Sequence, residues 1–330
     1  MKLKNKYILV VIYVLMIALC GCSKKQPQKI YRVGILAGNP FVTIIDGFKA
    51  KMAELGYVEG KNIVYDVHNL GFDPLGYDRV NKKFVEDKVD LIFAFPTEPA
   101  QSAKAATKGT NIPVIFAQAG LEGSNLIESI PKPGGNITGS RFPGPDIVVK
   151  RFEILLESAP DIKRLYVPYD KNYPIVAPAL KKLRSAASFK DVILVELPVI
   201  SSIEIQTDIE NRMKSADIGV DAILLLPEIL TQTPESWAII SRFAVEFKLP
   251  LVGSSPATVE KGGIFSYNVD PFESGRLAAE KTNKVLKGVP AGTIMVATPP
   301  SHLRINYKIA KELGLTVPEG LLSMADEVIR

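Results

Sequence analysis

The stretch that decides the fold is Val89-Asp-Leu-Ile-Phe-Ala-Phe-Pro96, which has a counterpart in Val220-Asp-Ala-Ile-Leu-Leu-Leu-Pro227. Both are short apolar runs of the kind that forms a strand buried on both faces of a parallel sheet. Each is followed by a helical pattern and then by a proline-containing apolar segment, at 112–115 and at 249–252. Any α/β chain can reuse such pieces, but two matched pairs in the same order favour two related lobes.

Strands and helices alternate on both sides of these runs. In the first half, apolar runs predict strands at 31–36, 62–67, 89–95 and 112–117, and helical spacing predicts helices at 41–55, 77–88 and 98–108. In the second half the strands are 163–168, 192–196, 220–226 and 249–252, with helices at 175–187 and 204–216. This alternation is typical of βαβ units and predicts an α/β fold with mostly parallel sheets.

The N-terminus has the pattern of an export signal. Three lysines precede the apolar run 7–19, which at about 13 residues is shorter than a bilayer-spanning helix. Leu19-Cys-Gly-Cys22 resembles a bacterial lipobox, with small Gly21 before Cys22, whereas Cys20 would follow bulky Leu19. We therefore expect a signal peptide at 1–21, a lipidated tether at 22–29 and an extracytoplasmic protein anchored to a bacterial membrane through Cys22. The alternative is a short transmembrane anchor ending in two ordinary cysteines.

Composition excludes several classes of protein. The chain has 330 residues, 47% hydrophobic and 23% charged, which allows about two globular domains and is unlike a disordered chain or a coiled coil. The net charge of +5 includes three lysines of the signal, so the rest carries 37 − 35 = +2. A nearly neutral body predicts no nucleic-acid partner. Two cysteines and two histidines are too few for a disulfide scaffold or a zinc site, and we expect no metal.

Motifs for catalysis are missing from the sequence. It contains no His-Glu-x-x-His, no Gly-x-Ser-x-Gly and no Gly-x-Gly-x-x-Gly after the first strand. Binding without chemistry is therefore the simpler hypothesis, with no cofactor, although an extracytoplasmic enzyme stays open as an alternative.

Polar and aromatic residues follow the predicted strands in both lobes. Ligands of open α/β sheets bind beyond the carboxyl ends of the strands. Thr97, Thr233 and Ser255 resemble N-caps, with proline within two residues, and helix N-termini suit a carboxylate. The predicted ligand-binding residues are Phe41, Phe95, Thr97, Glu98, Gln118, Tyr169, Asp170, Tyr173, Glu228, Thr231, Ser254, Ser255, Tyr267, Asn268 and Asp270.

Several separate stretches resemble one family. They are Gly47-Phe48, Glu54-Leu-Gly-Tyr-Val-Glu-Gly-Lys-Asn-Ile63, Val89-Asp-Leu-Ile92, Pro133-Gly-Gly-Asn-Ile-Thr-Gly139 and the tail 304–329. Together they are similar to the substrate-binding lipoproteins of ABC transporters, in the family that includes tryptophan- and tyrosine-type binding proteins. The chain departs from that family at 95–99, where a Gly-Thr-Pro-like turn is common, and at 118–122, where an Asp-Pro is frequent. Both departures lie on the ligand-facing edge.

The resemblance implies the type 1 periplasmic-binding-protein fold, in which two Rossmann-like lobes joined by three crossovers close on a small ligand. It places the N-terminal lobe at 30–140 plus 270–297 and the C-terminal lobe at 141–269 plus 298–330. The crossovers are expected at 133–143, 267–270 and 298–300. It also implies a monomer that delivers its ligand to an ABC permease and its ATPase.

An aromatic or other hydrophobic amino acid would suit the predicted residues. Its carboxylate could be held by Thr97, Ser254 and Ser255, and its ammonium by Asp170, Glu228 or Asp270. Its side chain needs an apolar wall, for which the aromatic residues near strand ends are candidates, unless they line the cores of the lobes. The alternatives are another small solute, such as a sugar or a nucleoside, or a sensing module that acts on a sensor kinase or chemoreceptor.

Overall fold

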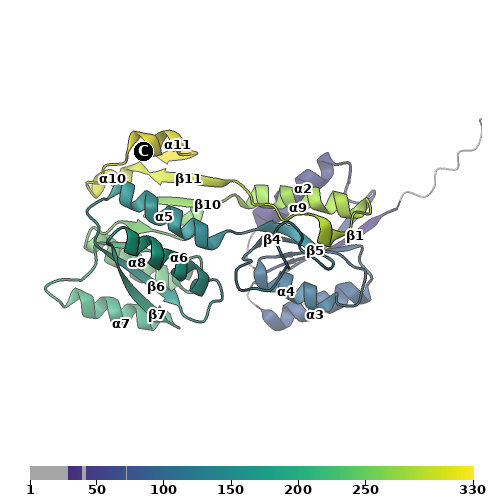
Figure 1. Ribbon diagram of the computed structural model, residues 1–330, viewed down its shortest axis with the longest axis horizontal. Coiled ribbons are helices and arrows are strands. Elements are labelled where there is room, and N and C mark those ends of the chain that lie inside the picture. The colour runs from purple at the N-terminus through teal and green to yellow at the C-terminus, as the bar shows by residue number, and fades with distance from the viewer. Residues whose placement is uncertain (1–28, 39–41, 72) are drawn as a thin grey trace, which may run out of the picture.

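The computed structural model describes residues 29–38, 42–71 and 73–330, which form two α/β lobes side by side (Figure 1). The sheet of the N-terminal lobe is fully parallel, in the order β2-β1-β3-β4-β5. Its strands are β1 (Tyr31–Ala37), β2 (Ile63–Asn69), β3 (Leu91–Phe95), β4 (Val114–Ala119) and β5 (Ile137–Arg141).

Helices cover both faces of this sheet. One face carries α2 (Val42–Glu54) and α9 (Pro271–Leu286), and the other carries α3 (Pro74–Glu86) and α4 (Thr97–Ala106), as Figure 1 shows. Every residue of β3 is buried, as expected for a strand covered on both sides. The apolar run at 89–95 therefore reflects its central place in the sheet.

The C-terminal lobe repeats this arrangement. Its parallel sheet has the order β7-β6-β8-β9. The strands are β6 (Arg164–Asp170), β7 (Ile193–Val199), β8 (Ala222–Leu224) and β9 (Leu251–Val252). The helices α5 (Gly144–Ser158) and α6 (Val176–Phe189) pack on one face, and α7 (Ser202–Met213) and α8 (Pro234–Glu246) on the other.

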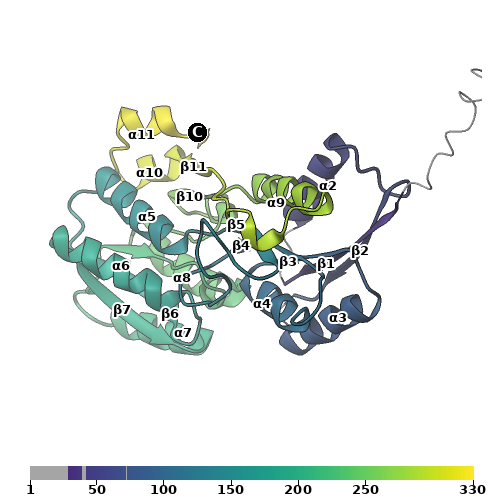
Figure 2. The same ribbon diagram turned by 45° about the vertical axis from the view of Figure 1, so that its right-hand side comes forward.

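A small third sheet extends the C-terminal lobe. β10 (Phe265–Val269) pairs antiparallel with β11 (Ser301–Asn306), and β11 pairs parallel with β12 (Glu327–Ile329). The short helices α10 (Tyr307–Glu312) and α11 (Glu319–Met324) lie beside it (Figure 2). Phe265, Leu303 and Ile305 join the core of the lobe, so the C-terminal tail is part of this body. Three single 3-10 turns are η1 (Leu230–Gln232), η2 (Pro256–Thr258) and η3 (Ala291–Thr293).

Three segments cross between the lobes: 142–143 before α5, Asp270 between β10 and α9, and 298–300 before β11. They lie close together, because Arg141 N donates to Ala297 O at 2.8 Å and Asp270 N donates to Pro300 O at 3.2 Å. The first crossover is shorter than the expected 133–143, since Ile137–Arg141 forms the edge strand β5. Gly134 and Gly135, both at positive φ, make the turn that leads into it.

The predicted elements of both lobes are present, and two strands of the C-terminal lobe have at most half their expected length. The strand expected at 220–226 pairs only over Ala222–Leu224, and the one expected at 249–252 only over Leu251–Val252. Pro227 and Pro250 flank these strands and have no N–H to continue a ladder. None of the helices formed by the described residues is long and apolar enough to cross a membrane.

Candidate functional site

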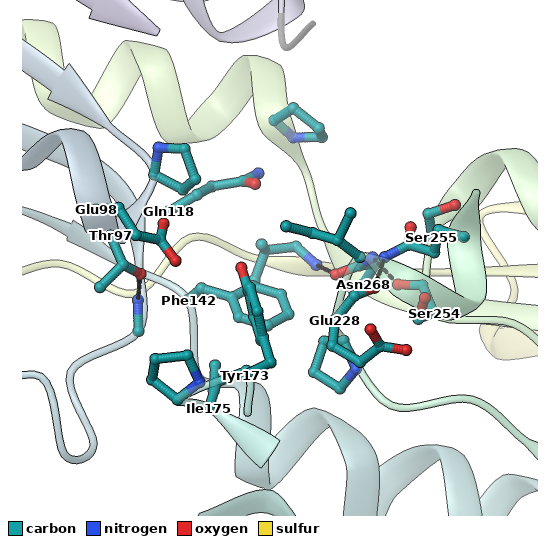
Figure 3. A pocket seen from close by; sticks show the side chains of 18 of the residues that line it. Thr97, Glu98, Gln118, Phe142, Tyr173, Ile175, Glu228, Ser254, Ser255 and Asn268 are labelled. Carbon is teal, nitrogen blue, oxygen red and sulfur yellow. Dashed lines mark hydrogen bonds between the residues drawn. The ribbon is translucent and has the colours of Figure 1, made fainter. Parts of the chain in front are cut away.

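A cavity of about 440 Å³ lies between the lobes, where strands of both sheets reach their carboxyl ends (Figure 3). Its volume lies in the range of small-molecule sites, about 300–1,000 Å³. Much of its wall is apolar and comes from Phe142, Tyr173, Ile175, Ile229 and five prolines: Pro96, Pro174, Pro227, Pro256 and Pro271. An apolar wall of this kind suits a hydrophobic ligand.

The cavity brings together residues that are far apart in the sequence. Eight of the predicted site residues line it: Thr97, Glu98, Gln118, Tyr173, Glu228, Ser254, Ser255 and Asn268. Six others do not: Phe95, Tyr169, Asp170, Thr231, Tyr267 and Asp270. Phe41 lies outside the described residues, as do the expected signal peptide and Cys22.

The aromatic residues outside the lining belong to the cores of the lobes. Phe95 is fully buried in the N-terminal core, and Tyr267 packs against the C-terminal core. Tyr169 is also buried there, and its hydroxyl donates to Glu196 Oε2 at 3.1 Å. These rings stabilise the lobes that carry the cavity walls.

The polar predicted residues that do not line the cavity make hydrogen bonds within turns and at a helix N-terminus. Asp270 is the N-cap of α9 and accepts from Phe272 N at 2.7 Å. Asp170 Oδ1 accepts from Asn172 N at 2.9 Å, in the turn after β6. Thr231 is fully buried and donates to Glu228. The two aspartates, considered as ammonium ligands, are thus occupied by backbone N–H groups.

The N-terminal wall includes Thr97, Glu98 and Gln118. Thr97 is not the N-cap of α4 as predicted, because the helix begins at Thr97 and the capping position is Pro96. Its hydroxyl instead accepts from Gly120 N at 2.9 Å and joins the loops after β3 and β4. Gln118 has a left-handed φ of 48°, at an irregularity in the β4–β5 pairing. Such irregularities re-aim side chains beside functional sites.

The C-terminal wall faces it with Ser254, Ser255 and Asn268 (Figure 3). Asn268 Nδ2 donates to Ser254 O at 3.0 Å, which fixes the loop after β9 to strand β10. Ser255 precedes the single turn η2 but makes no side-chain cap, whereas Thr233 caps α8 as predicted, accepting from Ser236 N at 3.3 Å. The hydroxyl of Ser254 is buried and has no partner among the described residues.

Three carboxylates line the cavity, namely Glu98, Glu122 and Glu228, while no lysine or arginine is found among its described lining residues. Both oxygens of Glu228 are engaged in its own turn, with Leu230 N and with the N–H and hydroxyl of Thr231. Burial raises the pKa of Glu228, and the hydrogen bonds from Thr231 and Leu230 oppose that rise. Glu228 therefore has little capacity left for a ligand.

Glu122 lines the cavity but was not among the residues predicted from the sequence. Its Oε1 lies 3.6 Å from Arg141 Nη1, and its Oε2 is buried without a hydrogen-bond partner in the part of the chain that is described. The signal that could have found it is its place in 118–122, a stretch that departs from the family pattern. A buried carboxylate oxygen in a cavity wall is a ready acceptor for a cationic group.

Tyr173 stands between the two walls with Phe142 beside it (Figure 3). Burial raises the pKa of Tyr173, and the charges of Glu98 and Glu228 raise it further. The hydroxyl therefore stays protonated, and it can donate a hydrogen bond while its ring face remains available for apolar contact.

Comparison with known proteins agrees with this geometry. Residues 30–329 match the family model described as ABC transporter substrate binding protein. The chain belongs to this family. A tyrosine-binding protein from Clostridioides difficile (strain R20291) is 31% identical to this ABC transporter substrate-binding protein over 275 residues, which are 82% of this chain and 76% of the relative.

Two solved structures resemble the substrate-binding protein along nearly all of the described chain. An ABC domain from Streptococcus pneumonia in complex with L-Trp has a TM-score of 0.78 and 27% identity, covering 91% of this chain and 100% of that one. The ligand-free, open form of a substrate-binding protein with adhesive properties from Clostridium difficile has a TM-score of 0.73 and 26% identity, covering 91% and 99%. The predicted two-lobed fold and the predicted family are thus confirmed.

Within the described residues no group of three or more His, Cys, Asp or Glu side chains could hold a metal ion. The arrangement at the cavity can bind a ligand by apolar contact at its centre and by polar contact at its two walls.

Proposed function

We propose that this protein captures an aromatic or other hydrophobic amino acid outside the cytoplasm and delivers it to an ABC permease with its ATPase. The observation that carries the proposal is a cavity that combines an aromatic and aliphatic wall with acidic side chains and no basic ones among its described residues. An apolar wall suits the side chain of such a ligand, and carboxylates in the wall suit its ammonium group.

The ammonium partner in this proposal is on the N-terminal wall. Glu98 lines the cavity at the start of α4, and Glu122 adds an oxygen that has no hydrogen-bond partner among the described residues, whereas Asp170 and Asp270 do not line the cavity. A relative that binds tyrosine and a structural neighbour in complex with L-Trp support the ligand class. The ligand is bound and released without chemical change. The protein acts as a monomer held to the membrane through a lipid on Cys22.

The test measures ligand binding to the full-length protein in detergent. The panel contains L-tyrosine, L-tryptophan, L-phenylalanine and L-leucine beside glucose, ribose and adenosine. We expect one or more of the amino acids to raise the melting temperature, since ligand at about 100 times its Kd adds about 2.7 kcal/mol of stability. Mass spectrometry of the released ligand should find it unchanged. Stabilisation by a sugar or nucleoside alone would overturn the amino-acid proposal.

A further inference from the structure

The guanidinium of Arg151, on helix α5, is entirely buried in the C-terminal lobe. Its Nε donates to Tyr267 O at 2.9 Å and its Nη2 donates to Ser254 O at 2.8 Å, while Nη1 has no partner among the described residues. No described carboxylate lies within 4.0 Å of it. Burial lowers the pKa of Arg151 to about 9, so the group is still charged at neutral pH.

A buried cation without a countercharge is unfavourable, because the protein interior solvates it less well than water does. An anion that arrives close to it would offset that cost. Arg151 is hydrogen-bonded to the cavity wall, because it donates to the carbonyl of Ser254 and Ser254 lines the cavity. The Ser254 hydroxyl is itself buried and unpartnered in the described part of the chain, so it has a free hydrogen-bond donor.

The N-terminal wall of the cavity carries two carboxylates. Glu98 and Glu122 belong to the N-terminal lobe, across the cavity from Ser254 and Asn268. Figure 3 shows Glu98 and Ser254 on opposite sides, with Phe142 and Tyr173 between them. The lining carboxylate of the C-terminal lobe, Glu228, already accepts hydrogen bonds from Leu230 and Thr231. Glu98 and Glu122 are therefore the carboxylates available to an ammonium, which orients a zwitterion with its ammonium toward the N-terminal lobe.

We propose that the C-terminal lobe binds the carboxylate of the ligand, with the Ser254 hydroxyl donating to it and buried Arg151 supplying the countercharge. Arg151 is a positioning residue here, because it acts through Ser254 and does not line the cavity. The inference rests on the proposed function, since it orients an amino acid within the same cavity.

The rival explanation is that Arg151 only clamps α5 to β10 and to the loop after β9. The two explanations differ in their dependence on the ligand carboxylate. The experiment therefore compares L-tryptophan with L-tryptophanamide, or L-tyrosine with L-tyrosinamide if tyrosine binds more tightly. Kd values are measured by calorimetry on the full-length protein at mildly acidic pH, where both ammonium groups are charged.

We expect the wild-type protein to prefer the acid to the amide by about tenfold or more, as for a hydrogen bond to a charged group. Arg151→Met and Ser254→Ala should bring this preference close to one, and Arg151→Lys should retain part of it. The matched control is Arg242→Met on α8, an exposed arginine, which should leave both affinities and their ratio unchanged.

Equal losses for acid and amide in the Arg151 and Ser254 variants would show a purely structural role and overturn the inference. If Arg151→Met does not fold, Ser254→Ala and Arg151→Lys decide the question by the same ratio. A wild-type protein that binds acid and amide equally would overturn the inference and leave the proposed function standing. A wild-type protein that binds no amino acid would overturn the proposed function itself.

Discussion

Glu122 is a cavity carboxylate with one buried oxygen that has no hydrogen-bond partner among the described residues. One of its oxygens lies near Arg141, and the other is buried without a partner among the described residues. A buried acceptor that lacks a hydrogen bond costs about 1–3 kcal/mol, and more when the group is charged. A ligand ammonium at this oxygen would remove that cost. Because the other oxygen of Glu122 lies near Arg141, the ligand would then contact the residue that directly precedes the first crossover.

Substituting Glu122→Gln should weaken amino-acid binding about tenfold or more, because the amide loses the charge that attracts an ammonium. Calorimetry with L-tryptophan and with indole-3-propanoate, which has no ammonium, separates the effects. The affinity for indole-3-propanoate should change little.

Two further variants complete this measurement. Glu98→Gln tests the other acid of the N-terminal wall, and Glu228→Gln should mainly lower stability, because the Glu228 carboxylate already accepts from Thr231 and Leu230. If Glu98→Gln abolishes L-tryptophan binding while Glu122→Gln does not, Glu98 is the ammonium partner and our assignment of Glu122 is wrong.

The sequence could indicate a cavity-lining position where a polar residue follows a buried strand, as Ser254 does after β9. It could not indicate the direction of a side chain where strand register decides that direction. Tyr169 is still inside β6 and faces the core, whereas Tyr173 lies in the loop beyond and reaches the cavity. Arg151 could not be identified from the sequence, because no helix was predicted over 144–158 and an arginine side chain is normally exposed.

At the scale of elements, α2 and α9 pack closely together, with a glycine on each side of the contact. A Cβ added at Gly47 would lie 2.1 Å from Phe272 O, and one added at Gly275 would lie 2.0 Å from Ile44 O. Tyr57 Oη also donates to Asn283 Oδ1 at 3.2 Å. The backbones of α2 and α9 therefore approach so closely at these two glycines that no larger residue fits at either position.

Gly275→Ala should destabilise the protein by about 1–3 kcal/mol, because the helices must move apart. The gain in helix propensity, at most about 1 kcal/mol, is too small to compensate. Denaturant unfolding gives the change in free energy of unfolding. Gly320→Ala on α11, where an added Cβ meets nothing within 4 Å, is the control and should be neutral or slightly stabilising. Equal effects of the two substitutions would contradict the close packing.

The alternation of strands and helices within each lobe was predictable because the apolar runs and the helical spacing are strong there. The helices α5 and α9 and the third sheet were not predicted. Strand β5 was not recognised, since Ile137-Thr-Gly-Ser-Arg141 is mostly polar or small and follows a Pro-Gly-Gly turn that is typical of a linker. It forms an edge strand, and its pairing with β4 is decided by tertiary contacts such as that of Thr138 Oγ1 with Ile294 O at 2.7 Å.

At the scale of the whole molecule, the fold explains why a ligand should affect both lobes at once. Cavity residues come from the loops of two separate cores, so a bound ligand contacts bodies that are otherwise joined by three crossovers. The pairing of the crossovers through Arg141 with Ala297 and Asp270 with Pro300 keeps these segments together.

The proposed attachment to the membrane has its own test. Cys22→Ser should release the protein from the membrane fraction of the expressing bacterium, because the sulfur that would carry the lipid is gone. Cys20→Ser, two residues earlier, should leave the membrane-bound fraction unchanged. Fractionation followed by immunoblotting measures both. If only the Cys20 variant is released, the lipidated residue is Cys20 and not Cys22. If neither variant is released, the protein is attached to the membrane in a different way.

The crossovers also limit how this protein could be rebuilt from parts. The N-terminal lobe needs α9, which follows the whole of β6 to β10 in the chain, and the C-terminal lobe needs β11 and β12, which follow α9. Neither lobe is a continuous piece of the gene. Exchanging one cavity wall with a relative therefore requires simultaneous junctions at all three crossovers. Recombination at a single point would combine α2 of one protein with α9 of the other. Change of ligand specificity is thus more accessible through substitutions in the wall loops than through shuffling of lobes.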